Sequence, residues 1–255
     1  ESMTSTQKCP ECGSPKIEAF GIGSQRIEDT LRSACPSARI LRLDSDTVDS
    51  PETLHRHSTD ISESRYDIVI GTEIALRPQT LSGFGMCAVI SLAQLISQPD
   101  FRQEERIMRV MRILREMTSG ELVVQSSLRD HPLVSEIASD DSELFFKRDI
   151  VFRRSFSYPP FSELIRLSVS DPVRLTAEKR SLIVKQAIAD GLSARKVPYT
   201  AVALAGPMPL PRPSIKKEFA YITILKVKDC HLAVKELCRS LPPYVSCDVN
   251  PRSLL

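Results

Sequence analysis

The chain has 255 residues, of which 42% are hydrophobic and 26% are charged, and its net charge is +2. These proportions fit a soluble globular protein with one large core or two ordinary ones, and no apolar run approaches the roughly 18–20 residues of a membrane helix. The N-terminus lacks an apolar segment, and the seven cysteines are an odd, scattered set, so we expect no signal peptide and a reducing, cytoplasmic location.

The first half of the chain alternates short apolar runs with helical patterns. Ser24 is a good helix-capping residue, and it precedes apolar residues at helical spacing. We expect strands at 16–22, 38–43, 66–70, 86–92 and 120–125, and helices from Ser24 onward, at 51–63 and at 102–117. This rhythm favours an α/β fold with a mostly parallel sheet flanked by helices.

Residues 129–160 interrupt the alternation. They predict one or two connecting helices, followed by a stiff segment, Tyr158-Pro159-Pro160-Phe161. Each proline fixes its own φ and pushes the preceding residue into extended geometry. We therefore place a domain boundary there.

The last third of the chain has the element order β-α-β-β-α-β. The expected elements are strands at 163–169, 200–204, 218–227 and 244–249, helices at 174–192 and 230–240, and a loop with prolines at 207, 209, 211 and 213. This order predicts a smaller α+β, ferredoxin-like (split βαβ) domain. That fold hosts many functions and does not indicate chemistry.

Charge is distributed unevenly along the chain. Residues 1–128 contain 14 basic and 18 acidic residues, whereas residues 129–255 contain 20 basic and 14 acidic residues. The second half is therefore the better candidate for contact with a polyanion. Ordinary variation of surface charge remains the alternative.

Several basic residues of the second half are candidates for DNA binding. Four phenylalanines at 145, 146, 152 and 156 alternate with basic residues, a mixture that can bind single strands; core anchoring of the rings is the alternative. Basic residues on the Pro-rich loop suit contacts to a nucleic-acid backbone. The candidates are Arg153, Arg154, Arg212, Lys216 and Lys217.

Two further patterns have a functional and a structural interpretation. The helix at 102–117 places five arginines along one side, which suits phosphate contact or, more simply, a solvated face paired with glutamates. The glycine-rich turn at 21–24 precedes a helix and can hold phosphate, but an ordinary turn with an N-cap is the simpler explanation. It is not a complete dinucleotide fingerprint.

Metal and catalytic signals are sparse. Cys9 and Cys12 form one half of a zinc knuckle, but a closed site needs four ligands and no second Cys-x-x-Cys occurs in the sequence. Asp44-Ser45-Asp46 is a weak signal for a hard cation. The four histidines show neither zinc-protease spacing nor a sequence partner suited to nucleophilic catalysis.

Ten short segments, taken in order, resemble the C-terminal half of the primosomal protein N′ (PriA) family of replication-restart helicases. They are 9–14, 21–31, 39–47, 68–73, 100–102 with 105–106, 120–125, 131–133, 158–161, 206–209 and 248–251. No single segment is decisive, but their order and spacing cover nearly the whole chain.

The resemblance implies a domain organisation and partners. Residues 14–155 would form a degenerate second RecA-like helicase lobe and 156–255 the C-terminal DNA-binding domain. Residues 1–13 would be the remnant of a zinc knuckle, in which Cys9 and Cys12 complete a zinc site with a pair upstream. Forked or single-stranded DNA, replication-restart proteins and single-stranded-DNA-binding protein would be the partners, in a nucleoid-associated setting without a membrane.

The sequence also departs from the family's motifs. The fifth helicase motif keeps Gly71 and Thr72 but lacks the family's Lys-Gly, and the arginine fingers of the sixth are replaced by a segment containing Arg112 and Arg115. These four residues are the vestigial nucleotide-binding set, and we expect no ATP cofactor because the sequence has no Walker A loop. The leading hypothesis is a non-catalytic DNA-binding and assembly module; the alternatives are a C-terminal fragment of an active ATP-dependent 3′–5′ helicase and a protein-interaction scaffold.

Overall fold

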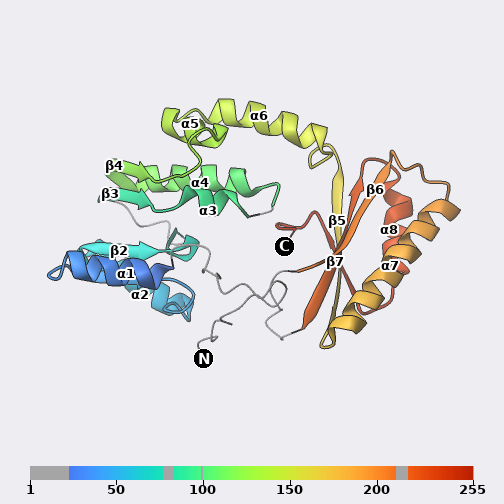
Figure 1. The fold of residues 1–255 in the computed structure, drawn as a ribbon, viewed down its shortest axis with the longest axis horizontal. Coiled ribbons are helices and arrows are strands. Elements are labelled where there is room, and N and C mark those ends of the chain that lie inside the picture. Colours follow the sequence, from blue (N-terminus) through green and yellow to red (C-terminus); the bar gives the residue numbers. More distant parts are fainter. Residues whose placement is uncertain (1–22, 77–82, 99, 211–217, 255) are drawn as a thin grey trace, which may run out of the picture. The chain divides into compact units, whose positions relative to one another are not determined.

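The computed structural model describes residues 23–76, 83–98, 100–210 and 218–254. These residues divide into two compact units (Figure 1). The first unit contains the described residues of 1–98 and 105–134, and the second those of 99–104 and 135–255. The second unit thus begins earlier than residue 156, and it includes a short segment from the middle of the chain. The predicted domain bounds themselves stay a prediction.

The first unit contains two pairs of parallel strands. The elements are α1 (Ser24–Ala34), β1 (Ile40–Leu43), α2 (Pro51–Ser62), β2 (Ile68–Gly71), the 3-10 helix η1 (Glu73–Leu76), β3 (Phe84–Val89), α3 (Leu92–Ile96), α4 (Gln103–Met117, whose first two residues belong to the second unit) and β4 (Thr118–Val124). β1 pairs with β2 and β3 with β4. The parallel pairing confirms a mixed α/β architecture, whereas the described strands form two small sheets instead of one. The RecA-like assignment stays a prediction.

One predicted strand of the first unit is partly wrong. The expected strand 86–92 ends at Val89, and a short helix, α3, begins at Leu92. The Ser91 hydroxyl accepts a hydrogen bond from the Gln94 amide and so caps this helix. Leu92 is fully buried as the first helical residue instead of the last strand residue. The expected strand 16–22 lies outside the described residues.

Gly71 ends β2 at a point where the chain has no room for a side chain. A β-carbon there would clash with the β-carbon of Ala75 in η1 and would lie 3.3 Å from the Leu43 carbonyl oxygen. Leu43 and Ala75 belong to the buried cluster of this sheet. Glycine therefore lets β2 turn into η1 against the core.

We expect Gly71→Ala to lower the free energy of unfolding of the first unit by about 1–3 kcal/mol, because the added methyl overpacks this turn. The matched control is Gly85→Ala in β3, where an added β-carbon meets nothing within 4 Å. Urea denaturation of both variants measures the difference. Equal midpoints for the two variants would contradict this account of Gly71.

The second unit contains the four-stranded sheet predicted for the last third of the chain. Its elements are α5 (Pro132–Ser139, which begins in the first unit), α6 (Ser142–Ser155), β5 (Glu163–Asp171), α7 (Arg174–Ala194), β6 (Val202–Pro209), β7 (Phe219–Val227), α8 (His231–Arg239) and β8 (Val245–Val249). The strand order is β6-β7-β5-β8 and every pair is antiparallel. Order and pairing are those of the predicted split-βαβ arrangement.

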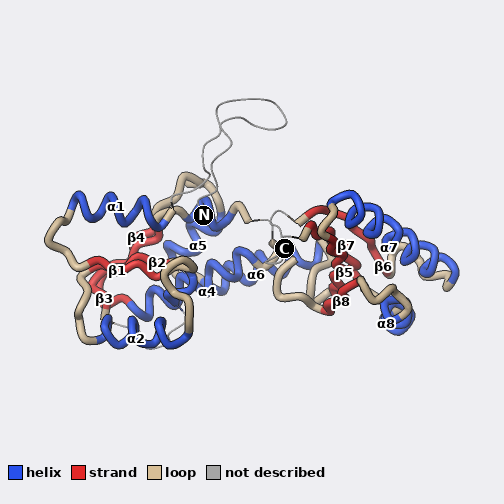
Figure 2. The backbone as a smooth tube through the Cα atoms, turned by 90° about the horizontal axis from the view of Figure 1, so that it is seen from below, coloured by secondary structure: helices blue, strands red, loops and turns tan. Residues whose placement is uncertain are grey.

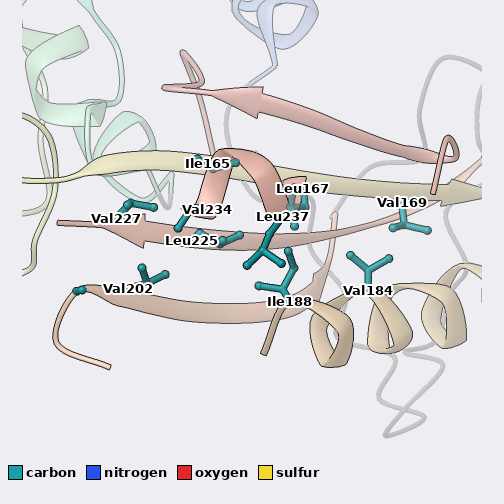
Figure 3. Close-up of a cluster of buried hydrophobic side chains, with 11 residues drawn as sticks. Ile165, Leu167, Val169, Val184, Ile188, Val202, Leu225, Val227, Val234 and Leu237 are labelled. Atoms are coloured by element: carbon teal, nitrogen blue, oxygen red, sulfur yellow. The ribbon is translucent and has the colours of Figure 1, made fainter. Parts of the chain in front are cut away.

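Helices α7 and α8 cover one face of this sheet (Figure 2). Val184 and Ile188 of α7 and Val234 of α8 pack against strand residues such as Leu167 and Leu225 (Figure 3). Burying these side chains removes apolar surface from water, at roughly 25 cal/mol per Å². This cluster is the main core of the second unit.

The edge strand β6 includes two prolines that the sequence analysis assigned to a loop. Pro207 and Pro209 lie within β6, which runs to Pro209. The register with β7 shifts between Ala205 and Met208, and prolines are tolerated at such irregular edge positions because an edge strand leaves backbone donors unpaired. Gly206 has φ +103° and lies against the Ile222 carbonyl, so only glycine fits there.

Among the described residues, no helix combines the length and the apolar character that crossing a bilayer requires.

Candidate nucleic-acid interface

An aromatic cluster closes the second face of the β6-β7-β5-β8 sheet. The Phe101 ring stacks on the Tyr158 ring, with centroids 4.5 Å apart and planes 3° apart. Phe101 is buried together with Leu164, Ile222 and Ile224, which lie on the sheet face opposite α7 and α8. Phe101 reaches this core from a segment about sixty residues before the sheet begins.

Cations lie over both rings of this stack. The Arg153 guanidinium is 5.3 Å from the Phe101 centroid, and the Lys226 Nζ is 3.6 Å from the Tyr158 centroid. Lys226 also donates a hydrogen bond to the Phe156 carbonyl. Burial, and then the neighbouring charge of Lys228, lowers the pKa of Lys226. Burial, and then the carboxylate of Asp100, raises the pKa of Tyr158.

The chain after β8 is tied to the same segment. The Asp100 carboxylate accepts hydrogen bonds from the Ser253 hydroxyl at 2.7 Å and the Leu254 amide at 3.1 Å. Arg102 donates to the Pro251 carbonyl, and Arg166 of β5 donates to the Ser253 carbonyl. Three of the segments that carry the family resemblance, at 100–102, 158–161 and 250–251, therefore meet in one place.

Arg148 of α6 is held between two glutamates. Its guanidinium lies 2.7 Å from Glu136 and 2.5 Å from Glu104, and the Glu136 side chain is only 2% exposed. Hydrogen bonding to Glu136 is the main factor that raises the pKa of Arg148 above its already high usual value. The neutralised pair allows a carboxylate to be buried at α5.

Arg148→Ala is expected to destabilise the second unit by about 3–5 kcal/mol, because it leaves the Glu136 carboxylate buried without a counter-charge. Lys147→Ala is the adjacent control: Lys147 and its partner Glu143 are 72% and 77% exposed, and such pairs contribute less than about 1 kcal/mol. Chemical denaturation compares the two. A loss from Arg148→Ala no larger than that from Lys147→Ala would disprove the structural role.

The two described DNA-binding candidates lie in different environments. Arg153 forms an ion pair with Asp149 at 2.6 Å, its side chain is 11% exposed, and it covers Phe101. These contacts are those of a packing residue. Arg154 is exposed, with its guanidinium 4.8 Å from the Phe161 centroid. Arg212, Lys216 and Lys217 lie outside the described residues.

The four phenylalanines of the α6 region also differ in their exposure to solvent. Phe145 is fully buried, as core anchoring predicts, whereas Phe146, Phe152 and Phe156 are 56%, 42% and 56% exposed. At 100° per residue, an exposed set of residues lies on one side of α6. We call this set the α6 strip: Phe146, Lys147, Ile150, Val151 and Arg154, all exposed. It combines an aromatic ring, aliphatic side chains and two cations.

The predicted vestigial nucleotide-binding residues lie in the first unit. Gly71 ends β2, and the Thr72 amide donates to the Leu43 carbonyl. Arg112 is exposed and pairs with Glu116 at 3.0 Å, while Arg115 lies half-buried on the same helix. The α4 arginine paired with Glu73, next to Thr72, is instead Arg106, at 3.7 Å. That contact has no signal in the sequence, and the nucleotide-binding roles stay a prediction.

Asp44, part of the weak cation signal, has a structural role. It is 5% exposed and accepts hydrogen bonds from the Ser24 hydroxyl, at the start of α1, and from the amides of Asp46 and Thr47. Burial opposes ionisation, but these hydrogen bonds and the charge of Arg42 hold the pKa of Asp44 below its usual value. Within the described residues, no group of three or more His, Cys, Asp or Glu could hold a metal ion. Cys9 and Cys12 lie outside those residues.

Known proteins resemble both parts of the chain. Residues 154–251 match the family model described as primosomal protein N C-terminal domain. The replication restart protein PriA of Bacillus subtilis (strain 168) is 29% identical over 86% of this chain and 27% of its own length. That of Synechocystis is 27% identical over 96% of this chain and 30% of its own length.

The chain resembles the C-terminal region of PriA. This confirms the resemblance drawn from the ten segments. The chain spans less than a third of the length of the PriA proteins cited. The family match begins within α6 and ends just after β8, so it covers the antiparallel sheet and both of its helices. Sequence reasoning had assigned Asp100 and Phe101 to residues 14–155, whereas they lie in the second unit. It had not singled out Lys226 as the cation over the Tyr158 ring.

Proposed function

We propose that the chain is a non-catalytic DNA-binding and assembly module in replication restart. In this proposal, the first unit is a degenerate RecA-like helicase lobe, and the second unit supplies the main DNA contact. The DNA is forked or single-stranded, and the partners are replication-restart proteins and single-stranded-DNA-binding protein. Similarity to proteins named replication restart protein PriA supports the process.

The α6 strip is the observation that carries the DNA-binding part. Lys147 follows the exposed Phe146 in the sequence and pairs with Glu143 at 2.7 Å, and the exposed Arg154 lies about two helical turns further along α6. Cations that track the backbone and rings that stack on bases are the usual means of binding single strands. The second unit as a whole contains 20 basic and 15 acidic residues, whereas the first contains 14 and 17. The charge difference favours the second unit as the polyanion-binding part.

The non-catalytic part of the proposal is supported by motif chemistry. Phosphoryl transfer requires positioned phosphates, a bound Mg²⁺ and a transition-state arginine together. These 255 residues contain no Walker A sequence. The nearest equivalents, Arg112 and Arg115, lie on a helix where Arg112 pairs with Glu116.

Binding to a forked oligonucleotide should weaken by at least about tenfold between 50 and 200 mM salt, because each neutralised phosphate contributes about −0.9 to the slope of log K against log salt. Fluorescence anisotropy with a labelled fork measures this. Absence of binding at 50 mM salt, or an affinity that does not change with salt, would refute the DNA-binding function.

Arg154→Ala should reduce the salt slope by about one phosphate contact, and Phe146→Ala should weaken single-strand binding without changing the slope. Arg195→Ala is the matched control, because Arg195 is an exposed arginine at the end of α7, outside the α6 strip. If all three variants bind like the parent protein, the α6 strip is not the contact surface.

A further inference from the structure

A pocket beside the family-like segment 158–161 has a mixed lining that the proposed function does not use. Its volume is about 360 Å³, which falls within the roughly 300–1,000 Å³ of small-molecule sites. One part of the lining is apolar and consists of Pro159, Pro160 and Phe161. The polar lining residues include Lys228, His231 and Asn250.

The walls of this pocket are held by hydrogen bonds. The Phe161 amide donates to the Tyr158 carbonyl, and the Ser162 hydroxyl donates to the Ser157 carbonyl at 2.6 Å. Asn250 exchanges two hydrogen bonds with Leu164, through its own amide N–H and its side-chain oxygen. Ligand binding to a preformed pocket loses less conformational entropy, because the walls are already ordered.

The charge in and around the pocket favours an anion. Its one carboxylate, Glu163, is hydrogen-bonded to the His231 ring at 3.0 Å and lies 3.8 Å from the Lys235 cation. Lys228 is exposed at the rim. Arg154 lies over the Phe161 ring and adds a second exposed cation. An apolar, partly aromatic wall beside these cations suits a ligand with a flat ring and an attached phosphate.

We propose that this pocket binds one nucleotide unit of single-stranded DNA, with the base against Phe161 and the phosphate near Lys228. The inference rests on the proposed function, since it assigns a specific nucleotide site to the DNA-binding unit. A bare phosphate would leave the apolar wall without a partner. A duplex would keep its bases stacked inside the helix, so an unpaired nucleotide fits better.

Fluorescence anisotropy with the full chain tests the proposal, using a labelled ten-nucleotide thymidine strand and the same strand built from abasic units. Because stacking of one base on an aromatic ring contributes measurably to affinity, the thymidine strand should bind about fivefold tighter or more. Phe161→Leu keeps the apolar volume but removes the aromatic face, so it should abolish this preference. Lys228→Gln should weaken binding of both strands.

Lys179→Gln is the control, because Lys179 is an exposed lysine on α7 away from the pocket lining. If Phe161→Leu and Lys228→Gln both match Lys179→Gln in affinity and in base preference, the pocket proposal is overturned. If the pocket proposal fails in this way but the protein still binds the fork with the expected salt dependence, the proposed function stands. Absence of binding to any DNA by the parent protein overturns both. Circular dichroism of each variant confirms that its fold is retained.

Discussion

Burial of both faces of the antiparallel sheet is the constraint on which the second unit depends. Helices α7 and α8 cover one face, whereas the other needs Phe101 and the chain after β8. The central strand β7 shows the consequence, because residues 221–225 are all buried instead of alternating in and out. Asp100 and Arg102 hold the residues after β8 near this face through hydrogen bonds.

Packing of the sheet faces also determines which cations stay exposed and can contact a ligand. Arg153 and Lys226 lie over the Phe101–Tyr158 stack, and Arg148 neutralises a buried glutamate. Such contacts stabilise the aromatic cluster by amounts of the order of 1 kcal/mol each. Arg154 is one helical position beyond Arg153, so a rotation of 100° places it on the exposed side of α6. Arg153 therefore packs against the aromatic cluster, whereas its neighbour Arg154 is available at the surface.

Much of the second unit's fold was predictable because its elements have clear local signals. The order of strands and helices followed from hydrophobic period and turn residues, and the sheet order confirmed it. The five-residue helix α3 was missed because so short an element has no period to detect. Pro207 and Pro209 were misassigned because only the position of β6 at an edge makes proline acceptable there.

The candidate site was less predictable, for a different physical reason. The partners of Phe101 come from β5, β7 and residues 158 and 254, so no local pattern indicates the cluster. The resemblance to a family marked the segments at 100–102 and 158–161 without revealing that they touch. Likewise, the sequence could not tell Arg153 from Arg154, because the distinction depends on Asp149 and the Phe101 ring.

Mapping of DNA cross-links on the full chain tests the central claim most directly. A fork carrying photoreactive bases in its single-stranded arm, irradiated with the protein at low salt, yields cross-linked peptides that mass spectrometry identifies. The account predicts that most cross-links fall within residues 135–254, with peptides from α6 among them. Cross-links confined to residues 23–98 and 105–134 would contradict the assignment of DNA binding to the second unit.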